Sequence, residues 1–166
     1  GFTHTRITEL GPAGIRHETA QARREIARVV GTRPHWFRPP YGAQNMRTFL
    51  ATRVQGMDIA VWAVDPSDAM TTRGFEIATD EHGALTMHAA GAPMALDPGS
   101  VLLLHDTPAG DDSDGSVSAT EAADRKVALI ARILDGINSV GGRTATLTEL
   151  LAAGVGSRRI WRSAGY

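Results

Sequence analysis

Three polar side chains in this sequence have the types and the placing of an acid–base reaction centre. Arg38 opens an Arg-Pro-Pro-Tyr-Gly segment, Asp68 closes an Asp-Pro-Ser-Asp turn, and His105 ends the apolar run Val-Leu-Leu-Leu. A histidine at a strand end could give or take a proton near neutral pH. A carboxylate such as Asp68 would fix the tautomer of a neighbouring imidazole, and a guanidinium such as Arg38 suits a carboxylate partner.

Two further residues are weaker candidates, and every candidate also has an ordinary structural explanation. Tyr41 follows two prolines, so its backbone N–H could stabilise an oxyanion. His4 is a single imidazole near the start of the sequence, where solvation is more common than metal binding. A histidine can end a strand without chemistry, Asp-Pro-Ser-Asp is common in turns, and an arginine beside prolines is commonly a surface residue.

Alternating helical and strand-like patterns are expected to position these residues. Helices are predicted over 12–30, closed by Gly31, over 45–53, and from Ser118 to the glycines at 141–142. Short strands are predicted at 36–37, 57–64, 101–104 and 144–147, with a helical turn at 148–152 and a short helix within a long loop over 70–99. This order predicts a parallel α/β sheet or barrel, with functional residues at the carboxyl ends of strands.

Apolar spacing predicts which faces of two helices are apolar, and how one of them begins. Met46, Phe49 and Leu50 share one face of the second helix. In the third helix the apolar residues at helical spacing are Val127, Ile130, Ala131, Leu134 and Ile137. Ser118, with Glu at the third position after it, predicts a capping box at the start of this helix.

Bulk composition excludes several classes of function. Seventeen basic against 18 acidic residues give a net charge of −1, so no global field favours nucleic acid. The chain has no cysteine and no apolar run long enough to cross a bilayer. Its length fits one domain, predicted over 1–153, followed by a tail at 154–166.

Four segments in order resemble the motifs of the NodB-type polysaccharide deacetylases (carbohydrate esterase family 4). They are Arg-Pro-Pro-Tyr-Gly at 38–42, Trp-Ala-Val-Asp-Pro-Ser-Asp at 62–68, Leu-Leu-His-Asp at 103–106, and Thr-Leu-Thr-Glu-Leu-Leu at 146–151. The resemblance implies an α/β fold, the NodB-like irregular (β/α) barrel, here missing its first strand or strands. It implies hydrolysis of N-acetyl groups on amino-sugar polymers or oligosaccharides, in an extracellular or cell-envelope protein.

The resemblance also implies a role for each candidate residue. His4 would correspond to the second histidine of a metal-binding pair, so that a divalent ion, Zn²⁺ in this reading, would polarise the acetyl carbonyl and supply water. His105 would protonate the leaving amine and Asp68 would tune it. Arg38 would orient the catalytic aspartate, Tyr41 N–H would hold the oxyanion, and Leu103 would wall the acetyl pocket.

Two departures from the family pattern bear on activity. The 166 residues contain no Thr-Phe-Asp-Asp-Gly motif, whose aspartates are the family's general base and a metal ligand, and Ala69 stands where tryptophan is common. We therefore expect this chain alone to be inactive, and an N-terminal segment or a separate polypeptide to complete the fold. A register with His4 as the first histidine would put Thr8 at the second and aligns less well. The alternative function is a non-catalytic carbohydrate-binding or scaffold domain.

Overall fold

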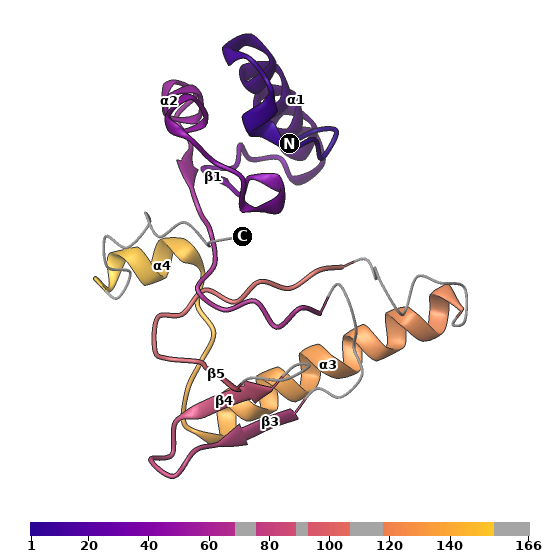
Figure 1. Cartoon of the computed structure of the whole chain (residues 1–166), viewed down its shortest axis with the longest axis vertical. Helices are drawn as coiled ribbons and strands as arrows, with labels where there is room; N and C mark the ends of the chain where they lie inside the picture. The colour runs from indigo at the N-terminus through magenta and orange to yellow at the C-terminus, as the bar shows by residue number, and fades with distance from the viewer. Residues whose placement is uncertain (69–75, 89–92, 107–117, 155–166) are drawn as a thin grey trace. The chain divides into compact units, whose positions relative to one another are not determined.

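The structure, a computed structural model, describes residues 1–68, 76–88, 93–106 and 118–154 (Figure 1). These residues fall into two compact units, Gly1–Val61 and the described residues from Trp62 onward. Within these ranges no helix has both the length and the apolar character needed to cross a membrane. Apart from Gly154, the predicted tail at 154–166 lies outside the described residues, and the prediction of one domain over 1–153 stays a prediction.

The first unit holds two helices and a pair of parallel strands. Its elements are the 3₁₀ turn η1 (Ile7–Glu9), α1 (Pro12–Val30), β1 (Trp36–Phe37), the 3₁₀ turn η2 (Pro40–Gly42), α2 (Met46–Val54) and β2 (Asp58–Ile59). β1 pairs with β2 in parallel, as Trp36 with Asp58 and Phe37 with Ile59. The core contains Ile7, Ile15, Phe37, Ala51, Met57 and Ile59.

The caps confirm both predicted ends of α1, and they place the start of α2 within one residue of the predicted position. Pro12 occupies the first turn of α1, and Gly31 ends it in the left-handed conformation with φ of 80°. At α2, the side chain of Asn45 accepts a hydrogen bond from Thr48 N at 3.0 Å. These caps place β1 and η2, with Arg38 and Tyr41, between the two helices in the chain.

Of the predicted apolar face of α2, only Phe49 packs against the core. Met46 and Leu50 are 58% and 55% exposed, whereas Thr48, Ala51 and Thr52 are buried. Thr52 Oγ1 donates to Thr48 O at 3.0 Å, so its hydroxyl is satisfied inside the helix. Two threonines can therefore occupy the core face without an unpaired polar group.

The second unit packs a helix against an antiparallel sheet. Its elements are β3 (Glu76–Thr79), β4 (Leu85–His88), β5 (Pro93–Ala95), α3 (Ala119–Ser139) and α4 (Leu147–Ala152). The sheet has the order β3-β4-β5, and Figure 1 shows α3 running along it. The core cluster consists of Val64, Met87, Leu129 and Ile133.

The prediction of a short helix in a loop over 70–99 is wrong wherever the structure describes this range. β3 and β4 form a hairpin whose turn is closed by Asp80: its Oδ1 accepts from His82 N and Ala84 N, and Gly83 has φ of 79°. The glycine supplies turn geometry here rather than breaking a helix. Residues 70–75 and 89–92 of the same prediction lie outside the described part.

Of the other predicted strands, 36–37 is confirmed as β1, whereas 57–64 and 101–104 are shorter than expected. Of 57–64, only Asp58–Ile59 pairs with a neighbouring strand, and Val64 forms one parallel bridge with Leu102. The predicted strand at 144–147 is wrong, because α4 begins at Leu147 behind a full capping box made by Thr146 and Glu149. Side-chain caps at 146–149 satisfy backbone groups that a strand would have left to a partner.

The buried face of α3 is turned by about one residue from the predicted one. Val127, Ile130 and Leu134 are exposed, and the buried positions are Ala122, Lys126, Leu129 and Ile133. Ser118 Oγ accepts from Glu121 N at 3.2 Å, while the Glu121 carboxylate pairs with Arg125 instead of closing the capping box. One half of the predicted box is therefore confirmed.

Gly136 sets how closely α3 approaches the sheet. A Cβ at this position would stand 2.6 Å from Ile77 Cγ2 and 3.3 Å from Leu85 Cδ1. Gly136→Ala gains about 1 kcal/mol of helix propensity, but overpacking costs about 1–3 kcal/mol, so we expect a net loss of stability. Urea unfolding of this variant measures the loss. In an Ile77→Ala background the same substitution should cost less or stabilise; an equal cost in both backgrounds would contradict the proposed contact.

Candidate active site

A parallel bridge between two segments brings Asp68 and His105 together. Val64 pairs with Leu102, and Leu103 N donates to Val64 O at 2.9 Å. Asp68 and His105 follow this bridge by four and three residues, on chains that run in the same direction. Both residues therefore emerge at the same end of the bridged segments.

A turn stabilised by Asp65 directs the Asp68 side chain inward. Asp65 Oδ1 accepts from Ser67 N at 2.8 Å, and Ser67 has the left-handed φ of 56°. Pro66 and Asp68 are fully buried on either side of the exposed Ser67. In the Asp-Pro-Ser-Asp segment the carboxylate of Asp65 therefore stabilises the turn, and that of Asp68 is buried inside the protein.

Asp68 and His105 make two hydrogen bonds. The ring nitrogen Nδ1 of His105 lies 2.8 Å from Asp68 Oδ1, and His105 N donates to Oδ2 at 2.9 Å. Asp68 is 1% exposed, whereas the His105 side chain is 39% exposed. Because Nδ1 faces the carboxylate, Nε2 is the ring nitrogen available to other groups.

Lys126 is a third member of this site. Its Nζ donates to Asp68 Oδ2 at 2.9 Å and to the Asp68 backbone oxygen at 2.5 Å. Burial alone would raise the pKa of Asp68, but the hydrogen bonds from the His105 side chain and backbone and from Lys126 outweigh it and lower this pKa. Asp68 is therefore a buried carboxylate held in its ionised form.

Lys126 was missed in the sequence, although one signal was present. It is the single lysine among 17 basic residues. It also shares the helical spacing of Ala122, Leu129 and Ile133, which form the buried face of α3. A cation on the apolar face of a helix is a sequence signal for a buried partner.

In the first unit, His4 and Tyr41 lie side by side. Their rings are 5.3 Å apart at 78°, and Arg6 Cζ lies 5.4 Å from the Tyr41 ring centroid. His4 and Tyr41 both have left-handed backbones, with φ of 59° and 58°. Such conformations are uncommon for residues with large side chains and are frequent at functional sites.

The Arg38 loop leaves two groups without partners. Gly42 N and Ala43 N close the 3₁₀ turn onto Pro39 O and Pro40 O, at 3.1 Å each. Among the described residues, Tyr41 N–H makes no hydrogen bond and the exposed Arg38 guanidinium makes no ion pair. Both groups are therefore available to a ligand or to another carboxylate.

The predicted site residues divide between the two units. His4, Arg38 and Tyr41 belong to Gly1–Val61, and Asp68, Leu103 and His105 belong to the second unit. Within the first unit the structure brings His4 to Tyr41, and within the second it brings Asp68 to His105.

The described residues do not by themselves form a metal centre. No group of three His, Asp or Glu side chains close enough to hold a metal occurs in the ranges that the structure describes. His4 supplies one imidazole, whereas protein zinc sites have three or four protein ligands. The predicted divalent ion therefore has one candidate ligand in this part of the chain.

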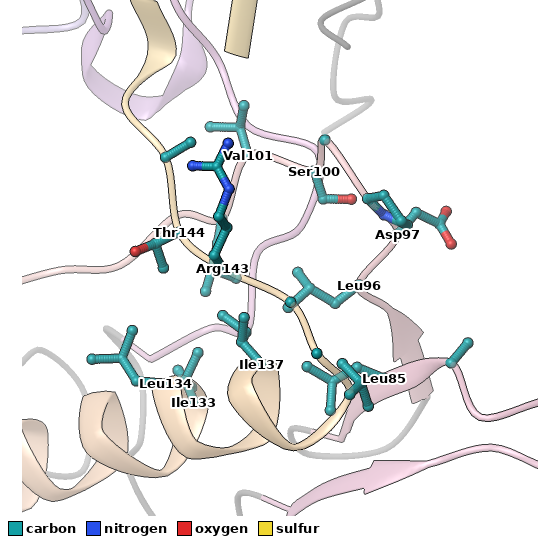
Figure 2. A pocket seen from close by; sticks show the side chains of 18 of the residues that line it. Leu85, Leu96, Asp97, Ser100, Val101, Ile133, Leu134, Ile137, Arg143 and Thr144 are labelled. Atoms are coloured by element: carbon teal, nitrogen blue, oxygen red, sulfur yellow. The ribbon is translucent and has the colours of Figure 1, made fainter. Parts of the chain in front are cut away.

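An apolar pocket of about 930 Å³ lies elsewhere in the second unit (Figure 2). Figure 2 shows Ile133, Leu134 and Ile137 of α3 facing it, with Arg143 at one side. Leu102 and Leu104 line it, but Asp68, Leu103 and His105 do not. In an extended segment alternate side chains share a face, so Leu103 lies on the side of His105, away from this pocket.

Comparison with known proteins finds similarity to polysaccharide deacetylases. A polysaccharide deacetylase family model matches residues 1–60. A bifunctional xylanase/xylan deacetylase of Cellvibrio japonicus is 27% identical over 131 residues, 79% of this chain and 17% of that protein. A peptidoglycan-N-acetylglucosamine deacetylase of Bacillus cereus is 26% identical over 149 residues, 90% of this chain and 46% of that protein.

A solved structure shows the same fold. The family 4 carbohydrate esterase from Streptomyces lividans, in complex with acetate, matches with a TM-score of 0.59 and 24% identity, over 87% of this chain and 62% of that one. The fold is thus the mixed helix and strand arrangement of the NodB-like deacetylases, of which this chain spans a part. The chain is similar to the polysaccharide deacetylases and shares the fold of the family 4 carbohydrate esterase.

Proposed function

We propose that this chain is part of an enzyme that hydrolyses N-acetyl groups on amino-sugar polymers or oligosaccharides. The observation that carries the proposal is the buried Asp68 carboxylate on Nδ1 of the half-exposed His105. This arrangement leaves Nε2 to exchange a proton with a substrate. The names of the relatives, one acting on xylan and one on peptidoglycan N-acetylglucosamine, support an acetylated glycan as substrate.

In the proposed reaction, water attacks the acetyl carbonyl carbon and the carbon–nitrogen bond then breaks. The imidazolium form of His105, which is protonated on both ring nitrogens, gives its Nε2 proton to the leaving amine and keeps its Nδ1–H on Asp68, which holds the ring. The free Tyr41 N–H donates a hydrogen bond to the developing oxyanion, and Leu103 contributes an apolar wall for the acetyl methyl group. The products are acetate and a free amino sugar.

The proton of the attacking water needs a base that we propose to lie outside these 166 residues. The unpaired Arg38 guanidinium suits an incoming carboxylate, bidentate where the geometry allows. We propose that an N-terminal segment or a separate polypeptide supplies this aspartate. His4 would become a ligand of a divalent ion, Zn²⁺ in this proposal, only if the same segment brought further ligands.

The experiment is an acetate-release assay on a fusion that places a Thr-Phe-Asp-Asp-Gly strand before Gly1, here called the motif fusion. We expect it to release acetate from N-acetylchitooligosaccharides or N-acetylated peptidoglycan, because amide cleavage needs an acid for the leaving amine and His105 supplies one. O-acetylated xylan serves as the ester comparison.

The matched control is the same fusion with both aspartates of the added motif changed to asparagine, which should release none. Absence of acetate from every N-acetylated glycan would contradict the proposal and favour a non-catalytic carbohydrate-binding or scaffold domain. We also propose an extracellular or cell-envelope location, since peptidoglycan and xylan lie there.

A further inference from the structure

We propose that Lys126 is a positioning residue, which keeps Asp68 ionised and clamps its carboxylate on Nδ1 of His105. The catalytic importance of this clamp rests on the proposed function, whereas the clamp itself is a structural claim. Lys126 does not line the apolar pocket and would touch neither substrate nor reacting atoms. It would act only through Asp68.

Lys126 contacts both the backbone and the side chain of Asp68. Nζ donates to the backbone oxygen at 2.5 Å and to the side-chain Oδ2 at 2.9 Å. An ammonium bound to both atoms restricts rotation of the side chain about the backbone. Oδ1 is then left facing His105 Nδ1 at 2.8 Å.

Charge compensation gives the pair a second role. Asp68 is 1% exposed and Lys126 is 4% exposed, so the carboxylate is shielded from water. A buried carboxylate without a cation tends to take up a proton. Among the described residues, Lys126 and His105 are the charged or titratable groups in contact with Asp68. Lys126 therefore lets Asp68 stay ionised both when His105 is neutral and when it is an imidazolium.

The protonation state of Asp68 decides the tautomer of His105. An ionised carboxylate only accepts, so Nδ1 carries a proton in both the neutral ring and the imidazolium, and Nε2 is the nitrogen that takes up and gives off a proton. A protonated Asp68 could donate a hydrogen bond to Nδ1. The proton of the neutral ring would then lie on Nε2, and Nδ1 would be the acceptor. Loss of Lys126 favours this second arrangement.

The placing of Lys126 in the sequence fits this role. It stands on the buried face of α3, where its aliphatic stem packs among core residues such as Leu129. Every other basic residue of the 17 in this chain is arginine. The compact ammonium can reach a backbone oxygen and a carboxylate in a small space, whereas the planar guanidinium is larger.

The test is the tautomer of His105 in the 166-residue chain, measured by long-range ¹H–¹⁵N NMR. Spectra are recorded about two pH units above the ordinary imidazole pKa near 6.5, where the free ring is neutral. We expect the Nδ1–H tautomer to dominate in the wild type. In Lys126→Met the Nε2–H form should become a major species, and the ¹³C titration of the Asp68 carboxyl should move to higher pH.

Two further variants keep the test decisive. Lys126→Gln retains a donor without charge and should shift the tautomer less than Lys126→Met; it also serves if the methionine variant does not fold. Leu129→Ala removes a buried side chain from the same face of α3 and should lower stability without changing the tautomer. An unchanged Nδ1–H tautomer in folded Lys126→Met and Lys126→Gln, or an equal shift in Leu129→Ala, would overturn the proposal.

Activity separates this inference from the proposed function. In the motif fusion, Lys126→Gln should lower kcat by roughly 10- to 100-fold, as loss of an outer partner does at other sites, with KM nearly unchanged. A tautomer shift in a fusion that releases no acetate would support the clamp and contradict the deacetylase. A lower kcat with an unchanged tautomer would overturn the clamp.

Discussion

Replacing His105 with alanine is expected to lower kcat for acetate release by the motif fusion by about 10²- to 10⁴-fold, the contribution typical of a general acid. The reason is that the leaving amine needs a proton and no other imidazole contacts Asp68 among the described residues. The measurement is steady-state acetate release, with the metal content of each preparation determined in parallel. The metal content should stay the same, since His105 is proposed to give a proton and not to bind an ion.

The matched control is His82→Ala, the same change at an exposed histidine of the second unit. It should leave kcat within about twofold, because surface substitutions away from a site have small effects. If His105→Ala lost the metal, or if both variants lost the same activity, the proton-donor role of His105 would be wrong.

Replacing Asp68 with alanine is expected to destabilise the chain by about 3–5 kcal/mol, because it leaves Lys126 buried without its counter-ion. Urea unfolding at neutral pH measures this effect, and an unchanged m-value would show that the loss is one of stability. The large cost arises because the Lys126 ammonium is left buried without a counter-ion. It does not measure the net contribution of the ion pair to stability.

The double variant Asp68→Ala, Lys126→Met distinguishes these two contributions. Since it removes both charges, it should be more stable than Asp68→Ala alone, although the wild-type contacts of two residues are lost. Strict additivity of the two single losses would contradict the ion pair.

The pH dependence of the pair follows from the lowered pKa of Asp68. A lowered folded pKa stabilises the protein above the unfolded value of 3.8, and this contribution is lost as the pH falls through the folded value. The stability difference between wild type and double variant should therefore shrink on acidification.

Local signals in the sequence predicted the parts of the fold that depend on neighbouring residues. Pro12 and Gly31 bound α1, and Asn45 caps α2, because caps act within one helical turn. The resemblance implied that Asp68 tunes His105; the structure places Asp68 Oδ1 2.8 Å from His105 Nδ1, and the roles of the two residues stay a prediction.

Features that depend on distant partners were not predictable in this way. β3, β4 and β5 were missed because a strand is defined by its pairing, whereas Gly83 reads locally as a helix breaker. Lys126 was missed because its partner lies 58 residues away and a helical lysine is usually solvated. The buried face of α2 was misread because Thr48 and Thr52 bury hydroxyls that the helix itself satisfies.

Acetate release from N-acetylchitooligosaccharides, measured side by side for the 166-residue chain and the motif fusion, tests the central claim most directly. That claim is that these residues supply the proton donor and the oxyanion donor of a deacetylase whose base comes from an added segment. We expect release by the fusion and none by the chain alone. Release by the chain alone, or none by a folded fusion, would contradict the account.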